Sequence, residues 1–413
     1  MLPRPQSLSP IFKIFILICF GLTSFTTSAQ SDSLKTEKPV VQEKKWYDKL
    51  SIRGYSQVRY NRLFETNPDL GCDQCDKSWG DNNGVFIRRG RVIISGMVTD
   101  RVYIYVQPDF AAAVSTNSQH FLQIRDFYAD YYIDKKQNFR LRFGQSKIPY
   151  GFENMQSSSN RLPLDRNDAL NSALPNERDL GAIVYYTPKK VRDFFAEALK
   201  TGIKGSGDYG MIGFGIYNGQ AANRAEQNNN LHIVGRITYP FMFKSQVLEV
   251  SAQAYTGKVV ITSDQISSGT KVNASRNYLD ERAALSLVLY PKPFGIMTEY
   301  NIGKGPKFNT VTDSIETAPL RGGYVMINYM LKLNNQIFFP FARGQYYNGG
   351  KKQEKDARAY EVTEYEAGIE WQLNKGFEFT ASYVISDRKY EDFVKQDNRQ
   401  KGQLLRLQAQ MNF

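Results

Sequence analysis

The segment from Phe86 to Phe110 carries the pattern that most constrains how this chain folds. Apolar residues alternate there with polar or aromatic residues, on both sides of a short break at Thr99-Asp100. A period of two residues predicts two β-strands with unlike faces, because a helix would repeat about every 3.6 residues. One face is aliphatic, and the other carries Arg89, Arg91, Gln107 and Asp109. A hairpin with one hydrocarbon face and one aqueous face, repeated around a closed sheet, predicts a transmembrane β-barrel.

The composition agrees with strands, rather than helices, as the membrane-spanning elements. The chain has 413 residues, of which 26 are Tyr and 26 are Phe. Its mean hydropathy is −0.47, and beyond the N-terminus no apolar run approaches the roughly 18 residues that a spanning helix needs. Enrichment in Tyr and Phe is typical of strands and of the aromatic girdles of barrels.

The N-terminus has the pattern of a secretory signal. Arg4 and Lys13 precede or interrupt an apolar stretch, and small residues up to Ala29 follow it. This order predicts cleavage after Ala29, so that residues 1–29 form a signal peptide. A lipid-modified Cys19 is the alternative, but the residues before it are not the small ones that such a site uses.

The rest of the chain divides into a short polar periplasmic leader at 30–50 and the barrel at 51–413. Loss of Arg4 and Lys13 with the signal changes the net charge from +12 to +10. The remaining basic residues are spread through strands and loops, so nucleic acid is not an expected partner. In an exported protein this positive excess favours small anions or anionic lipid headgroups as partners.

The usage of cysteine and histidine indicates neither a metal centre nor a catalytic site. Cys72 and Cys75 remain after cleavage, and the only histidines are His120 and His232. Zinc needs about four ligands, so a disulfide between the two cysteines is the favoured interpretation in an oxidising compartment, with a redox or metal role as the alternative. Neither histidine lies in a pattern typical of a hydrolase, and no glycine-rich loop opens a helix. We therefore expect no enzymatic activity and no cofactor.

Sixteen segments with the alternating pattern follow one another along the chain, an even number, as single-chain bacterial barrels have. They lie at 51–62, 85–98, 101–113, 121–133, 138–147, 179–187, 210–217, 231–239, 246–257, 281–290, 293–303, 321–333, 336–347, 361–373, 376–388 and 402–413. The last segment ends in Phe413 and so resembles the aromatic ends of chains inserted into outer membranes; the last strand of a soluble sandwich is the alternative. We expect an all-β, closed antiparallel transmembrane barrel in the bacterial outer membrane.

The connections alternate in length, as expected when long surface loops face outwards and short turns face the periplasm. The connections 99–100 and 134–137 are short, whereas 148–178 is long enough to fold inwards and narrow the pore. The exception is 188–209, a long connection on the periplasmic side. It contains either an amphipathic helix around 191–199 or an extra strand pair, which would raise the strand count to eighteen.

Three motifs lie in the second segment, in the fourth, and at the end of the fifth. They are R-R-x-R at Arg88, Arg89 and Arg91; R-D-x-Y at Arg125, Asp126 and Tyr128; and G-Q-x-K-x-P-x-G-x-E at Gly144, Gln145, Lys147, Pro149, Gly151 and Glu153. Together they resemble the motifs of the phosphate-selective porin O and P family, and the resemblance covers the first half of the chain best. It implies a sixteen-stranded, trimeric channel with a surface loop folded into the pore.

The alternation also predicts which charged side chains face the lumen. Basic residues gather in the first, second and fifth segments and acidic residues in the eleventh, fourteenth and fifteenth, which places opposite charges on opposite walls. The expected pore-lining or anion-binding residues are Arg89, Arg91, Arg140, Arg142, Lys147, Arg161, Arg166 and Arg178. Asp109, Asp126 and Asp130 lie between the basic stretches, and the alternative is that they simply pair with these arginines.

Two functions remain open from the sequence. The first is a porin for passive diffusion of small anions, with phosphate or polyphosphate as candidate solutes, since arginine matches phosphate through its two-pronged donor geometry. The second is a non-selective or structural outer-membrane barrel, and an enzyme on the same barrel is a distant third.

Overall fold

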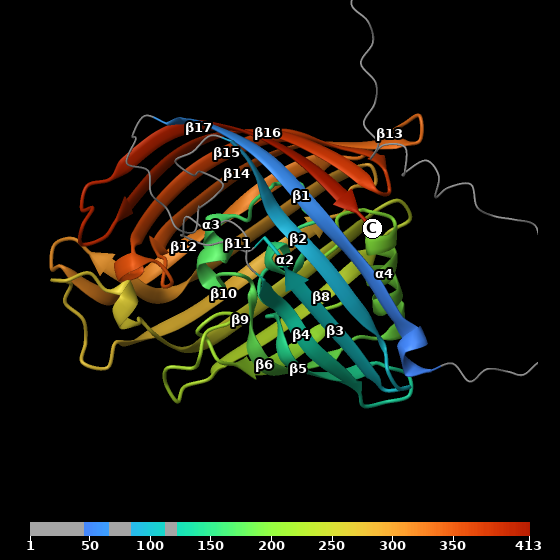
Figure 1. Ribbon diagram of the computed structural model, residues 1–413, viewed down its shortest axis with the longest axis horizontal. Coiled ribbons are helices and arrows are strands. Elements are labelled where there is room, and N and C mark those ends of the chain that lie inside the picture. Colours follow the sequence, from blue (N-terminus) through green and yellow to red (C-terminus); the bar gives the residue numbers. More distant parts are fainter. Residues whose placement is uncertain (1–44, 66–83, 112–121) are drawn as a thin grey trace, which may run out of the picture. The chain divides into compact units, whose positions relative to one another are not determined.

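A single antiparallel sheet dominates the computed structural model, which describes residues 45–65, 84–111 and 122–413. Its strands are β1 (Leu50–Glu65), β2 (Gly84–Met97), β3 (Val102–Asp109), β4 (Gln123–Tyr132), β5 (Phe139–Lys147), β6 (Arg178–Tyr186), β7 (Ile212–Tyr217), β8 (His232–Met242), β9 (Val247–Val260), β10 (Asn277–Leu289), β11 (Phe294–Asn309), β12 (Ser314–Tyr329), β13 (Leu331–Leu333), β14 (Gln336–Gly350), β15 (Ala359–Asn374), β16 (Phe377–Glu391) and β17 (Arg399–Asn412). Neighbours in the chain pair with each other, and β1 also pairs with β17, so the sheet closes into a barrel (Figure 1).

The barrel closes between its first and last strands. Tyr55 lies opposite Asn412 in the register of β1 and β17, and Gly54 and Phe413 exchange two backbone hydrogen bonds of 2.8 and 3.0 Å. Glycine is required at position 54, because an added Cβ would lie 2.3 Å from the carbonyl oxygen of Arg91 and 2.5 Å from the Phe413 ring. The aromatic C-terminal residue therefore packs against the first strand at the point of closure.

The closed barrel has sixteen strands and one short extra strand. The extra strand is β13, which pairs with β14 beside the end of β12. All sixteen expected segments contain a strand. The main difference is at 304–320, a gap between two of the alternating segments and therefore expected to be a surface loop, where β11 and β12 pair as far as Asn309 and Ser314. Pairing along a long hairpin outweighs the weak strand propensity of those residues.

The two faces of the barrel differ as the alternation predicts. Along β8, buried and exposed residues alternate, with Arg236 inside and Ile237 outside. Large exposed side chains on the strands include Phe127, Phe143, Phe214, Leu285, Val325 and Ile385. The inner face carries buried charged side chains such as Arg142 and Glu366. An apolar outer face and a charged inner face are what a barrel in a bilayer requires.

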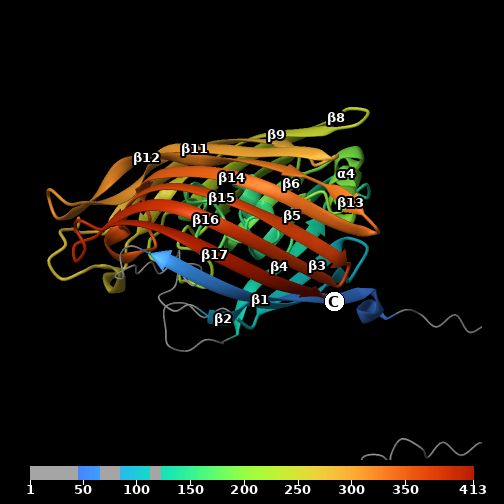
Figure 2. The same ribbon diagram turned by 90° about the horizontal axis from the view of Figure 1, so that it is seen from above.

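The two ends of the barrel differ in their connections. Most of the turns at one end are short, and this end also holds the C-terminus and α4 (Lys189–Lys200) (Figures 1 and 2). Bacterial barrels place their short turns in the periplasm, which assigns this end to the periplasmic side. The connection 188–209 lies at this end. It contains the expected helix, and the extra strand pair considered as its alternative is not formed in these residues.

Three predictions from the sequence concern residues that the structure does not describe. These are the signal peptide at 1–29, most of the leader at 30–50, and the disulfide between Cys72 and Cys75. The described part of the leader is the short helix η1 (Trp46–Lys49), after which β1 begins at Leu50. Of the helices in the described ranges, none has both the length and the apolar character needed to span a membrane.

Candidate pore constriction

The connection between β5 and β6, residues 148–177, folds into the barrel. It forms α2 (Phe152–Met155) and α3 (Asp168–Ala173), which lie within the ring of strands (Figure 1). None of its residues is exposed, and Ile148, Tyr150 and Phe152 are completely buried. The prediction of an inward-folded loop is confirmed, and we call residues 148–177 the constriction loop.

Gly151 of the longest motif allows the two helices of the constriction loop to pack. Its φ of +81° is a conformation that residues with a side chain rarely adopt. An added Cβ would also lie 2.8 Å from Leu170 Cδ1, on α3. The glycine therefore serves the path of the loop and not the binding of a solute.

Glu299 on β11 fixes the start of α2 to the wall across the lumen. Its carboxylate accepts hydrogen bonds from the backbone N–H groups of Phe152 and Glu153, at 2.6 and 2.8 Å. The hydroxyls of Ser286 and Tyr324 donate to the same carboxylate, at 2.7 and 3.1 Å. Two of these four hydrogen bonds hold the loop, and the other two fix the carboxylate to the wall.

Glu153, the last residue of the same motif, joins the two halves of the loop. It accepts hydrogen bonds from the backbone N–H of Asn167, at 2.8 Å, and from its side-chain amide. Arg343 on β14 lies 3.2 Å from the other oxygen of Glu153. A buried ion pair with additional hydrogen bonds is the arrangement in which such charges are tolerated.

Gln145 and Lys147, which belong to the same motif as Glu153, also hold other parts of the chain in place. Gln145 donates to the carbonyl of Ile124 at 2.9 Å and accepts from the backbone N–H of Asn223 at 3.1 Å. The ammonium of Lys147, expected to bind anions, donates to the carbonyls of Met155 and Gln156 at the end of α2. The motif thus connects the end of β5 to the constriction loop.

Most of the expected anion-binding arginines are paired with carboxylates. Close nitrogen–oxygen pairs are Arg91–Asp109 at 2.9 Å, Arg142–Asp130 at 2.7 Å, Arg178–Asp126 at 2.8 Å, Arg140–Asp208 at 2.7 Å and Arg166–Glu177 at 3.1 Å, and Arg178 also pairs with Glu177. Arg125 of the second motif shares Asp109 with Arg91, at 3.3 Å. The alternative that the three aspartates of the basic stretches pair with these arginines therefore describes the structure.

Several cationic side chains surround Glu177 at the end of the constriction loop. Burial alone would raise the pKa of Glu177, but Arg166, Lys147 and Arg178 hold it well below its usual range. Burial lowers the pKa of Arg166 to about 10, and Glu177 opposes that shift. Both groups are therefore charged at neutral pH.

Arginines exceed carboxylates where the loop meets β1, β2 and β17. Asp165 of the loop lies 3.0 Å from Arg59, 3.5 Å from Arg88 and 3.2 Å from Arg406. Burial would raise the pKa of Asp165, but Arg59, Arg406 and Arg88 hold it well below its usual range. The side chain of Asp165 is still 20% exposed, so water reaches this region.

Arg89 and Arg161 are the least compensated cations of this region. Among the described residues, Arg89 donates a single hydrogen bond, to Gln57 at 2.9 Å, and Arg89 forms no ion pair. The Arg161 side chain is 1% exposed, and its nearest carboxylate oxygen, on Glu177, is 4.0 Å away. Nε and Nη1 of Arg161 have no hydrogen-bond partner among the described residues. We call Arg59, Arg88, Arg89, Arg161 and Arg406 the basic cluster.

A second segment enters the lumen from the periplasmic end. Residues 201–210 follow α4, and the Lys204 ammonium, 1% exposed, pairs with Glu370 on β15. The side-chain amides of Gln156 and Asn160 in the constriction loop donate to the carbonyls of Lys204 and Gly205. The narrowing of the lumen is therefore built from two segments. Sequence reasoning missed the second one, although the glycine-rich run after the amphipathic helix was a usable signal.

The acidic residues lie on β11, β15 and β16 as the alternation predicts, and most of them have cationic partners. The expectation of opposite charges on opposite walls is wrong for β15 and β16, because the closed sheet places them beside β17 and β1, and Glu366 on β15 lies 3.9 Å from Arg406 on β17. Glu364 pairs with Arg388 at 2.7 Å, and Glu366 with Arg343 at 2.9 Å. Because these charges are compensated locally, the acidic strands contribute less field than their composition suggests. Within the basic cluster, Arg59, Arg88 and Arg406 share Asp165, and Arg89 forms no ion pair among the described residues.

A closed sixteen-stranded barrel with an inward loop and a charged lumen defines the class of outer-membrane porins. Two solved channels share this fold. The outer membrane channel DcaP of Acinetobacter baumannii is 14% identical, with a TM-score of 0.52 over 88% of this chain and 97% of that one. OmpF of Salmonella typhi, solved with daunomycin, is 14% identical, with a TM-score of 0.54 over 89% of this chain and 98% of that one. No curated protein sequence matches this chain.

The family is defined by the sequence itself. Residues 68–413 match the family model of phosphate-selective porin O and P. The chain therefore belongs to the phosphate-selective porin O and P family, and is a porin of the bacterial outer membrane. Family and fold point to a channel and not to an enzyme.

Proposed function

We propose that this porin lets small anions diffuse in preference to cations, with phosphate or polyphosphate as candidate solutes. The observation that carries the proposal is the basic cluster, and within it Arg89 and Arg161. Arg59, Arg88 and Arg406 share the carboxylate of Asp165, Arg89 forms no ion pair among the described residues, and the nearest carboxylate oxygen to Arg161, on Glu177, is 4.0 Å away. A lumen that combines a net positive field with low-dielectric walls raises the local concentration of anions.

The size of the effect follows from Coulomb's law. At about 8 Å, with an effective dielectric constant of about 20, one unit charge changes the energy of a passing monovalent ion by about 2 kcal/mol. Salt screens charges over about the same distance at physiological ionic strength. Arg89 and Arg161 together therefore support a modest preference that grows as the salt concentration falls.

Phosphate suits this cluster for a geometric reason. A guanidinium group presents parallel N–H donors that match two oxygens of a phosphate, and Nε and Nη1 of Arg161 have no hydrogen-bond partner among the described residues. The second candidate function, a non-selective barrel, is favoured by the pairing of Arg91, Arg142 and Arg178, which leaves fewer cations available to solutes.

The experiment is competition between phosphate and chloride in single channels. We expect millimolar phosphate to reduce the chloride current through the wild type, and to reduce it much less through Arg89→Gln with Arg161→Gln. Arg399→Gln is the matched control, because Arg399 is 60% exposed and pairs with Asp387 at the surface. Equal sensitivity of all three proteins to phosphate would contradict a solute site at the basic cluster.

We also propose that the channel is a trimer. The proposal rests on family membership. Native mass spectrometry of the detergent-extracted protein tests it, and a predominant monomer under conditions that preserve the fold would contradict it.

A further inference from the structure

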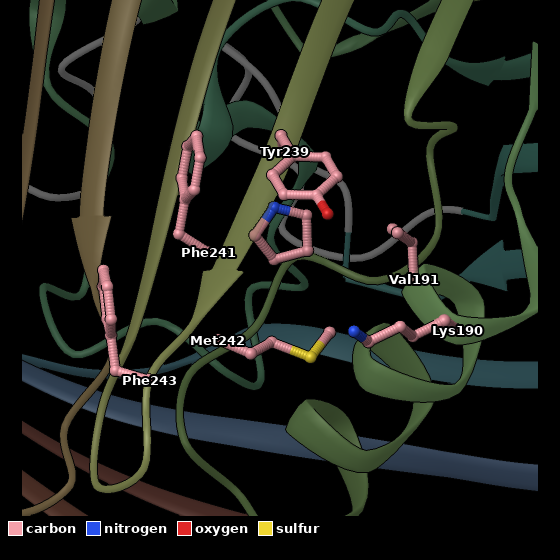
Figure 3. Close-up of a pocket in the computed structure, with 7 residues that line it drawn as sticks. Lys190, Val191, Tyr239, Phe241, Met242 and Phe243 are labelled. Carbon is pink, nitrogen blue, oxygen red and sulfur yellow. The ribbon is translucent and has the colours of Figure 1, made fainter.

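A pocket at the periplasmic rim lies apart from the pore. It sits between the first turn of α4 and the end of β8, and has a volume of about 230 Å³. Its lining residues are Lys190, Val191, Tyr239, Pro240, Phe241, Met242 and Phe243 (Figure 3). Val191 and Pro240 are buried, whereas the other five are exposed, so the pocket opens to the surroundings of the barrel.

The aromatic residues place this pocket at a boundary of the membrane. Tyr239 and Phe241 are both 45% exposed and lie on the outward-facing side of β8, with ring centroids 4.9 Å apart. Aromatic side chains at the ends of barrel strands form girdles at the level of the lipid headgroups. The pocket therefore lies where the periplasmic leaflet changes from hydrocarbon to headgroups.

Lys190 supplies a cation that no carboxylate in the described ranges neutralises. Its neighbour Lys189 pairs with Asp193 at 2.5 Å, and Arg192 donates to the carbonyls of Lys136 and Gln137. Lys190 has no ion pair or hydrogen bond within the part of the chain that the structure describes. Its amine extends across the pocket towards the Met242 side chain (Figure 3).

A second cation follows a lining residue of the pocket in the chain. Lys244 follows Phe243 in the turn between β8 and β9, is exposed, and has no ion pair among the described residues. Two lysines without an ion pair among the described residues, together with aromatic and aliphatic side chains, complement a molecule that carries both an anionic group and hydrocarbon.

We propose that this pocket binds an anionic phospholipid of the periplasmic leaflet. The phosphodiester lies against Lys190 and Lys244, and the acyl chains run along Tyr239 and Phe241 on the outer face of β8. The volume corresponds to about eight water molecules, at about 30 Å³ each, which suffices for a phosphate and its glycerol but not for a whole lipid. Free phosphate would use the lysines and leave the apolar lining uncovered.

The test measures lipid binding to the full chain in detergent by native mass spectrometry, with phosphatidylglycerol and phosphatidylcholine as probes. A lysine near an anionic lipid surface contributes about fivefold to binding. We expect phosphatidylglycerol to bind more tightly than phosphatidylcholine, and its affinity to fall about fivefold in Lys190→Gln and further in Lys190→Gln with Lys244→Gln. Phe241→Ser should also weaken binding, because the acyl chains lose their contact surface.

The matched control is Lys200→Gln, which removes the same charge at the other end of α4. Lys190 is exposed, so its substitution does not disturb folding. Equal binding of phosphatidylglycerol to wild type and Lys190→Gln would overturn the proposal, as would equal binding of the two lipids. Displacement of bound lipid by inorganic phosphate, with no effect of Phe241→Ser, would show an anion site and not a lipid site.

Discussion

Glu299→Gln is expected to loosen the constriction loop while the barrel stays folded. The Glu299 carboxylate accepts two backbone hydrogen bonds from the start of α2, at 2.6 and 2.8 Å. A glutamine keeps one acceptor oxygen and turns an NH2 group towards the other N–H, so at least one of these bonds is lost. A hydrogen bond to a charged group contributes about 1.5–3 kcal/mol. A loss of about 2–3 kcal/mol raises the population of the detached loop roughly 30- to 140-fold.

Single-channel recording in a planar bilayer measures this change directly. We expect Glu299→Gln to show more open-channel noise and additional conductance levels, because the loop end moves in the lumen. Glu361→Gln is the matched control, since Glu361 is exposed on β15. Circular dichroism should show the same strand content for all three proteins. Recordings of a folded Glu299→Gln protein that match the wild type would refute the role of Glu299 as the anchor of the loop.

Three further predictions concern the loops. Removal of residues 155–174 should raise single-channel conductance because it removes most of the constriction loop; an unchanged conductance would contradict its place in the conduction path. Asp165→Asn should increase anion preference, and by the same amount at pH 5 as at pH 8, because the arginines around Asp165 hold its pKa well below its usual range; the charge of a carboxylate with a depressed pKa is present above that pKa and is lost only as the pH falls through it. If the reversal potentials of the wild type and Asp165→Asn differ at pH 8 but not at pH 5, Asp165 takes up a proton in the pH range of an ordinary carboxyl group, which would contradict this prediction. Cys72 and Cys75 should resist maleimide labelling on intact cells until a reductant is added, and labelling of both thiols without reductant would contradict the disulfide.

The number of strands and the inward fold of the constriction loop were predictable because both follow from local sequence. A period of two residues reports which face of a strand each side chain occupies, and it assigned Arg142 and Glu366 to the lumen correctly. The length of 148–178 was enough to predict an inward loop, since connections much longer than a hairpin turn are usually functional.

The sequence did not predict which charged side chains of the lumen form ion pairs and which do not. Arg89 and Arg91 lie two residues apart on the same face and in the same motif. Arg91 meets Asp109 across the β2–β3 pair, whereas Arg89 meets only Gln57 within the described chain. Contacts such as Arg59 with Asp165 join residues more than one hundred positions apart, and they depend on the path of the loop through the barrel.

The reversal potential of the wild-type channel under a potassium chloride gradient tests the central claim most directly. If Arg89 and Arg161 give the lumen its field, the potential lies on the anion side, moves further in that direction at low salt, and returns towards zero in Arg89→Gln with Arg161→Gln. A wild-type potential at zero or on the cation side would contradict the anion preference and leave a non-selective barrel as the function of this porin.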